Sequence, residues 1–220
     1  MLKYIKSENY KDGAESMAKT IIRFLNEGKR VLWILTGGSS IPACVEVFNH
    51  VKQNYSLDNL TVTLTDERYG PVGHADSSWQ KLIDEGFVFE GLHTIPVLTG
   101  ATFEDTASQF EENIKNAFNN NDVIISAFGI GSDLHIAGIL PNRSASNESE
   151  LVLAYHTPTF NRITLTFGAI KRVNIAYVFI FGDTKKKVIS ELQNRDQPLF
   201  IKPAFILKSI QEVYIYSDQI

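Results

Sequence analysis

The stretch RVLWILTGGSSIPACVEVFNHVKQ, residues 30–53, contains the pattern that decides the fold. It starts with an apolar run typical of a buried strand and then passes through two glycines. An amphipathic segment follows, with serines and Pro42 near its start, as is typical of a helix N-terminus. The stretch therefore predicts a buried strand, a glycine turn and a helix capped by a serine.

The same alternation continues along the rest of the chain. Further helices are predicted over residues 12–28, 77–85, 102–118 and 184–192, and further strands over 60–69, 93–98, 122–131, 151–155, 162–167, 176–182 and 212–217. Strands separated by helices predict a three-layer α/β/α fold with a mainly parallel, Rossmann-like sheet that helices cover on both faces. Because no repeat or linker interrupts the pattern, we expect residues 1–220 to form one domain.

Composition and charge narrow the class of protein. With 44% hydrophobic and 21% charged residues in a chain of 220, the composition is that of a globular protein with a substantial core. The formal net charge is −4 and no basic stripe is present. We therefore expect neither nucleic acid nor an anionic membrane as a partner, although local cations could still hold a small anion.

Metal and disulfide chemistry is not expected. Cys44 is the one cysteine, which excludes an intrachain disulfide and a Cys-based zinc site. The histidines outside the motifs below show no metal-ligand spacing, so we predict no metal and no cofactor. The opening MLKYIKSENY lacks the apolar core of a signal peptide, and no apolar run approaches the roughly 20 residues of a membrane span. We expect a cytoplasmic protein.

Polar residues follow four of the predicted strands at their carboxyl ends. The motifs are TGGSS at 36–40, TDERY at 65–69, GIGSDLH at 129–135 and GDTK at 182–185. In open α/β sheets, ligands bind in the crevice beyond these strand ends. We therefore expect the four motifs to lie together along one edge of the sheet.

The glycine turn suits a phosphate. Gly37, Gly38 and Ser39 lie between a strand and a helix, where free backbone N–H groups and close approach favour an anion. A tight strand-to-helix turn with no ligand is an equally good interpretation of this stretch alone. No Gly-Lys-Ser/Thr follows, so it is not a Walker loop, and Leu134 breaks the dinucleotide fingerprint that GIGSDL begins.

The charged residues of TDERY have two possible roles. Alternation along a strand places Asp66 and Arg68 on one side and Glu67 on the other. Asp66 and Arg68 are candidates for a site, although an exposed salt bridge is the commoner outcome for such a triplet. Two further cations are candidates for phosphate binding: Arg162 opens the strand RITLTF, and Lys185 follows Gly182 at a strand-to-helix junction.

His135 is the candidate general base. An imidazole titrates near neutral pH and can take a proton from water, and the nearby Asp133 can orient it. In an extended stretch, Asp133 and His135 would point toward the site and Leu134 would pack on the other side. The alternative is a histidine that only satisfies a loop carbonyl. A serine nucleophile is not expected, because no Gly-x-Ser-x-Gly motif is present.

Taken in order, these motifs resemble one family. TGGSS with Pro42, TDERY with HADSSW, GIGSDLHIAGILP, RITLTF, and GDTK with PLFIKP are similar to the 6-phosphogluconolactonases, whose superfamily also holds glucosamine-6-phosphate deaminase. The resemblance implies a single α/β/α domain and hydrolysis of 6-phospho-D-glucono-1,5-lactone to 6-phosphogluconate in the pentose phosphate pathway, without a metal.

The resemblance also implies roles for individual residues. His135 matches the general base and Asp133 the carboxylate beside it. Ser39 and the glycines match the phosphate loop, Arg68 a substrate-contacting arginine, and Arg162 and Lys185 cations around the phosphate.

This chain departs from the family pattern at three places. Leu134 stands between Asp133 and His135 where the family usually has glycine. Ser78 ends a segment that is usually Asp-Ser-Asn, and Ser39 or Ser40 stands where the glycine loop usually has Thr or Arg. If the glycine position needs a positive φ, a leucine there is strained by about 1–2 kcal/mol.

Two alternative functions remain open from the sequence. One is an isomerase or deaminase of an amino-sugar phosphate, in which Asp66 would move a proton between carbons. The other is a sugar-phosphate-binding protein without catalysis.

Overall fold

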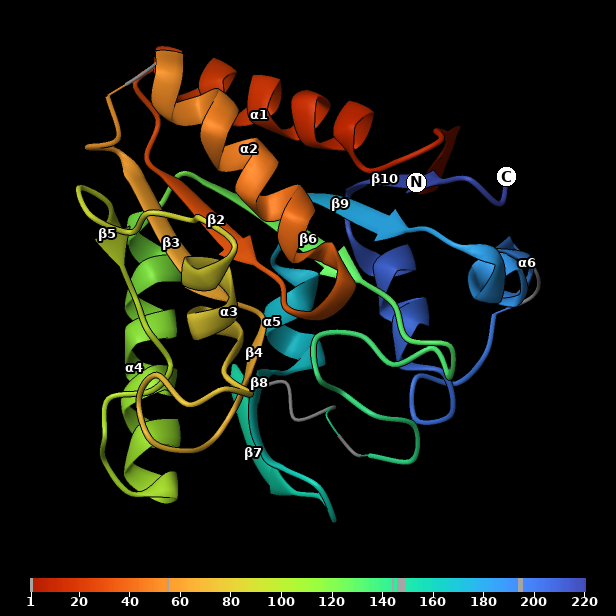
Figure 1. The fold of residues 1–220 in the computed structure, drawn as a ribbon. Coiled ribbons are helices and arrows are strands. Elements are labelled where there is room, and N and C mark those ends of the chain that lie inside the picture. The colour runs from red at the N-terminus through yellow and green to blue at the C-terminus, as the bar shows by residue number, and fades with distance from the viewer. Residues whose placement is uncertain (1, 55, 144, 146–148, 194–195) are drawn as a thin grey trace.

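A seven-stranded parallel sheet forms the centre of the computed structural model (Figure 1), which describes residues 2–54, 56–143, 145, 149–193 and 196–220. In spatial order its strands are β1 (Leu2–Lys6), β10 (Glu212–Ser217), β9 (Ile175–Ile180), β6 (Val123–Gly129), β2 (Val31–Leu35), β3 (Leu60–Leu64) and β5 (His93–Thr94). All neighbouring pairs in this sheet are parallel. The predicted parallel sheet is confirmed.

Helices cover both faces of this sheet (Figure 1). Helices α1 (Lys11–Asn26) and α2 (Ile41–Asn54) pack against each other on one face, and α4 (Phe103–Asn120) and α5 (Phe167–Lys171) lie on the other. The remaining helices are α3 (Ser78–Asp84) and α6 (Lys186–Gln193), with 3-10 turns η1 (Gly38–Ser40), η2 (Asp183–Lys185) and η3 (Pro203–Ser209). The three-layer α/β/α prediction is confirmed.

The central strands carry the core. All five residues of β2 and all six of β9 are buried, as expected for strands covered on both faces. The buried apolar side chains of the described residues form one cluster, which includes Trp33, Phe48 and Phe128. No helix in the described part of the chain is long and apolar enough to cross a membrane.

The segment 60–69 is not one strand, contrary to the sequence prediction. It breaks after Leu64, and β4 (Asp66–Arg68) joins a second sheet with β8 (Asn161–Leu165) and β7 (Val152–His156). This three-stranded sheet is antiparallel. The break turns Asp66 and Arg68 away from the β3 direction and pairs them with β8, so it brings Arg162 directly opposite Arg68.

Further differences concern short elements and the start of the second helix. Strand β1 and helix α5, with the turn η3, were absent from the sequence prediction, and β5 has only two of the six residues predicted. The predicted serine cap of the second helix is wrong: η1 leads directly into α2, and the buried Oγ of Ser40 has no partner among the described residues. A 3-10 turn already continues the chain into the helix, so no separate cap forms.

Candidate active site

The predicted edge of the sheet is hollowed. A cavity of about 260 Å³ opens beyond the ends of β2 and β6, beside β4 and β8. It is lined by Thr36, Gly37, Gly38, Ser39, Asp66, Arg68, Ser78, Gly129, Ile130, Gly131, His135, Ala137, Gly138, Arg162 and Lys185. All four strand-end motifs contribute to this lining. The prediction that they lie together is confirmed.

His135 lines this cavity and forms a close pair with Asp133. Nδ1 of His135 lies 2.6 Å from Oδ1 of Asp133, which also accepts the backbone N–H of His135 at 3.1 Å. Burial raises the pKa of Asp133, but the amide and ring of His135 outweigh it and hold that pKa below its usual value. An ionised Asp133 accepts Nδ1–H, which leaves Nε2 of His135 as the proton acceptor.

The loop that holds this pair is a turn and not the extended stretch that we predicted. The N–H of Leu134 donates to the carbonyl of Gly131, and the N–H of Gly131 donates to the carbonyl of His135. Leu134 adopts a φ of 66°, in the left-handed region that favours glycine. The turn forms because it satisfies these backbone groups locally, and it brings Asp133 and His135 together more closely than alternation would.

The leucine does pack inward, as predicted. Its side chain is only 3% exposed and belongs to the hydrophobic core, and its carbonyl accepts the N–H of Ala204. Burial of a leucine contributes about 1.5–3 kcal/mol, which is enough to offset the ~1–2 kcal/mol of left-handed strain. Packing therefore holds a conformation that the family pattern assigns to glycine.

Leu134→Gly should lower stability while keeping activity. The change removes the buried side chain and adds entropy to the unfolded chain. Relief of the backbone strain offsets only part of this loss of stability. We expect a net loss of about 1–3 kcal/mol and a Tm lower by several degrees, measured by thermal unfolding. Leu134→Ala also loses the buried side chain but keeps the backbone strain, so it should be no more stable than Leu134→Gly. A Leu134→Gly protein that is fully stable but inactive would contradict this account.

Two arginines face one another across the second sheet. Arg68 in β4 pairs with Arg162 in β8, and both guanidinium groups lie over the ring of Phe160, at 5.6 and 6.0 Å from its centroid. The Nε atoms of both arginines are buried without a partner among the described residues. Like charges opposite each other repel, so this arrangement favours an anion between them.

Lys185 supplies the third cation of the lining. It ends η2, after Gly182 at a φ of 100°, and its Nζ donates to the carbonyl of Ile130 at 2.6 Å. Burial lowers its pKa, and the nearby Asp133 partly opposes this. The hydrogen bond holds the ammonium group beside the His135 loop.

Asp66 is the one carboxylate among the described lining residues. Its Oδ1 accepts the hydroxyl of Thr65 at 3.0 Å, and Oδ2 lies 3.4 Å from NH1 of Arg162. A Cβ on Gly138 would lie 2.5 Å from Oδ2, so the glycine makes room for this carboxylate. The three cations of the lining thus outnumber its acidic side chains, which favours an anionic ligand.

The glycine turn, residues Gly37 to Ser39, also lines the cavity. Gly38 has a φ of 67°, and a Cβ on Gly37 would lie 2.4 Å from Oγ of Ser78. Sequence reasoning did not select Ser78 as a site residue, although it opens the helix that follows TDERY. Thr36, Gly131 and Gly138 were also missed, because only the assembled turn shows which neighbours they touch.

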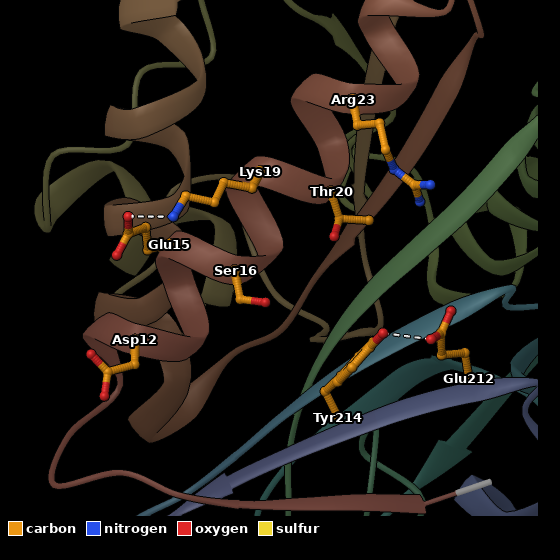
Figure 2. A pocket seen from close by; sticks show the side chains of 8 residues that line it. All are labelled: Asp12, Glu15, Ser16, Lys19, Thr20, Arg23, Glu212 and Tyr214. Carbon is orange, nitrogen blue, oxygen red and sulfur yellow. Dashed lines mark hydrogen bonds and ion pairs between the residues drawn. The ribbon is translucent and has the colours of Figure 1, made fainter.

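A larger depression of about 580 Å³ lies elsewhere, between α1 and β10 (Figure 2). In this depression Lys19 pairs with Glu15 at 2.7 Å, and Tyr214 donates to Glu212. It lies away from the carboxyl strand ends that form the cavity. We therefore place the active site in the smaller cavity.

The described residues contain no group of three or more His, Cys, Asp or Glu side chains that could hold a metal ion. Cys44 is buried, and burial raises the pKa of its thiol to about 12. A thiol with this pKa is protonated at neutral pH, so Cys44 is neither a ligand nor a nucleophile candidate.

A family model described as "Glucosamine-6-phosphate isomerases/6-phosphogluconolactonase" matches residues 6–215. The chain belongs to this family. Its match extends over nearly all of the described structure, and it includes every motif at the cavity.

Relatives and solved structures agree with this membership. A Dictyostelium discoideum protein named "Probable 6-phosphogluconolactonase" is 26% identical over 203 residues, covering 86% of this chain and 85% of its own. A 6-phosphogluconolactonase from Thermotoga maritima superposes with a TM-score of 0.81 at 21% identity, over 99% and 98% of the two chains. A monomeric glucosamine-6-phosphate deaminase gives a TM-score of 0.80 at 17% identity, over the same shares. The two structural likenesses show the family fold, which both activities share.

Proposed function

We propose that this protein hydrolyses 6-phospho-D-glucono-1,5-lactone to 6-phosphogluconate, a step of the pentose phosphate pathway. The observation that carries the proposal is that His135, paired with Asp133, lines the same cavity as Arg68, Arg162 and Lys185. This cavity offers a proton acceptor next to an anion-binding wall. Relatives of this chain are named for the same reaction, one as "Probable 6-phosphogluconolactonase" and one as "6-phosphogluconolactonase".

In this mechanism a water molecule attacks the lactone carbonyl. Nε2 of His135 takes the proton of the water, and Asp133 stabilises the resulting imidazolium through Nδ1. Cations and backbone N–H groups of the lining stabilise the oxyanion, a contribution often worth ~3–4 kcal/mol. When the tetrahedral intermediate collapses, the ring C–O bond breaks and the imidazolium returns a proton to the leaving oxygen.

We assign the phosphate to the glycine turn and to the anion-binding wall, by which we mean Arg68, Arg162 and Lys185. The Nε atoms of Arg68 and Arg162 have no partner among the described residues, and Lys185 also lines the cavity. The chain at Gly37–Ser39 offers backbone N–H groups at close approach. Binding of the phosphate would orient the lactone toward His135. Asp66 beside Arg162 would limit the charge of the wall and hold that arginine in place.

The decisive assay uses freshly generated 6-phosphogluconolactone and corrects for spontaneous hydrolysis. We expect proton release in a pH-stat well above the uncatalysed rate. Ammonia release from glucosamine 6-phosphate would instead support the deaminase alternative, and tight binding of both compounds without turnover would support a binding protein. Either result would overturn the lactonase proposal.

Arg162→Ala should weaken binding of the phosphorylated lactone by about tenfold or more, since a hydrogen bond to a charged group contributes about 1.5–3 kcal/mol. The measurement is KM, together with the Kd of 6-phosphogluconate by calorimetry. Arg30→Ala is the matched control, because Arg30 lies at the start of β2 and pairs with Asp122 at the opposite end of the sheet. The wild type should hydrolyse the non-phosphorylated lactone poorly; equal use of both lactones would contradict the phosphate assignment.

Four sequence predictions remain proposals. The single core of the described residues supports one domain over residues 1–220, which limited proteolysis can test. We also propose a cytoplasmic location, a small-molecule sugar phosphate as the partner, and catalysis without cofactor or metal. Cell fractionation tests the location, and dialysis against a chelator tests the metal.

A further inference from the structure

The carboxylate of Glu67 lies behind the wall of the cavity and is fully buried. Its Oε1 accepts the N–H of Arg68 at 2.8 Å and the N–H of Ser78 at 2.7 Å. Its Oε2 accepts the hydroxyl of Ser77 at 2.8 Å and the N–H of Trp79 at 3.0 Å. A carboxylate has about four acceptor positions, so no capacity remains for a ligand. Glu67 therefore binds groups of the protein itself and not a ligand.

These donors come from two different elements. Arg68 belongs to β4, whereas Ser77, Ser78 and Trp79 form the start of α3. The carboxylate thus joins the strand that carries Arg68 to the helix that carries Ser78. Both of these residues line the cavity, and Glu67 does not.

The same segment also contacts the Arg68 guanidinium and the glycine turn. NH1 of Arg68 donates to the carbonyl of Asp76 at 3.0 Å, just before the start of α3. On the other side, Oγ of Ser78 lies where a Cβ on Gly37 would be only 2.4 Å away. A shift of the start of α3 would therefore both move Arg68 and disturb the packing against Gly37.

A buried carboxylate makes this connection at a cost in free energy, because its charge is removed from water. Burial raises the pKa of Glu67, while the amides of Trp79, Ser78 and Arg68 and the hydroxyl of Ser77 act in the opposite direction. None of the four donors is a side-chain cation, so the buried charge gains no ion pair from them. What the charge does provide is four acceptor positions with fixed geometry between two walls of the cavity.

We propose that Glu67 is a positioning residue of this site: its carboxylate sets Arg68 and Ser78 relative to each other and to the glycine turn, and so preorganises the anion-binding wall. The inference rests on the proposed function for its kinetic test. It concerns substrate binding and leaves the proton transfer at His135 untouched.

Glu67→Gln tests the proposal, because glutamine keeps the shape but turns one acceptor into a donor. Either amide orientation places an NH₂ group against a backbone N–H of Arg68, Ser78 or Trp79. We expect KM for the phosphorylated lactone and Kd for 6-phosphogluconate to rise about tenfold, with kcat within about threefold of wild type. Hydrogen exchange at the amides of Ser78 and Trp79 should become faster.

Glu111→Gln is the matched control. Glu111 also accepts backbone N–H groups, those of Leu151 and Val152, but from α4 and outside the cavity. It should lower Tm as Glu67→Gln does and leave KM unchanged. If both variants raise KM equally, or if neither does, Glu67 has only a structural role and the proposal fails.

Two further measurements cover the remaining outcomes. If Glu67→Gln does not fold, Ser77→Ala removes one donor and should raise KM about threefold; an unchanged KM there overturns the proposal. If wild type does not hydrolyse the lactone, the proposed function fails, and calorimetry with inorganic phosphate tests Glu67 separately. Weaker phosphate binding by Glu67→Gln than by wild type and Glu111→Gln then supports the positioning role, and equal or absent binding overturns it.

Discussion

His135→Ala is expected to lower kcat for lactone hydrolysis by ~10²–10⁴-fold, the usual contribution of a general base. The structure places Nδ1 of His135 on Asp133 and leaves Nε2 for a water molecule. Without the imidazole, the attacking water loses the proton acceptor that the mechanism assigns to it. The measurement is kcat for the freshly generated lactone at a fixed pH, corrected for spontaneous hydrolysis.

Binding should survive this change, because the anion-binding wall is separate from the histidine. The Kd of 6-phosphogluconate should stay within about threefold of wild type. His93→Ala is the matched control, since His93 is exposed on β5 at the far edge of the sheet. A His135→Ala enzyme with near-normal turnover would refute the assigned mechanism.

Gly131→Ala is expected to lower kcat by about 10²-fold or more, although it adds only a methyl group. A Cβ on Gly131 would lie 2.1 Å from Nδ1 of His135 and 2.6 Å from Oδ1 of Asp133. Because atoms cannot approach this closely, the imidazole and the carboxylate must shift away from the new methyl group. Misplacement of a catalytic group by about 1 Å can cost 10²-fold in rate.

Gly100→Ala separates this effect from general strain. Gly100 has a φ of 84° and open space around its Cβ position, so alanine there strains the backbone without touching the cavity. It should lower Tm and leave kcat unchanged. Gly131→Ala should do the reverse: kcat should fall while Tm changes little. Normal turnover by Gly131→Ala would show that catalysis does not need the observed geometry of Asp133 and His135.

The parallel sheet and the grouping of the strand-end motifs were accessible from the sequence. Apolar runs such as Val31–Leu35 indicate strands that are buried on both faces, and the polar residues that follow them mark the carboxyl edge of the sheet. Local chemistry was accessible in part: the sequence placed Asp133 near His135, and alternation separated Glu67 from Asp66 and Arg68. These inferences depend on neighbours along the chain, which the sequence displays directly.

Only the tertiary structure decided how distant segments meet. The break after Leu64 sends β4 into a second sheet, and its pairing with β8 sets Arg162 opposite Arg68, 94 positions apart in the chain. The left-handed turn at Leu134 depends on core packing that outweighs a local preference, and the buried bonds of Glu67 depend on where α3 begins. Periodicity along a strand carries no information about register with a remote strand or about space around a glycine, because both are set by long-range packing.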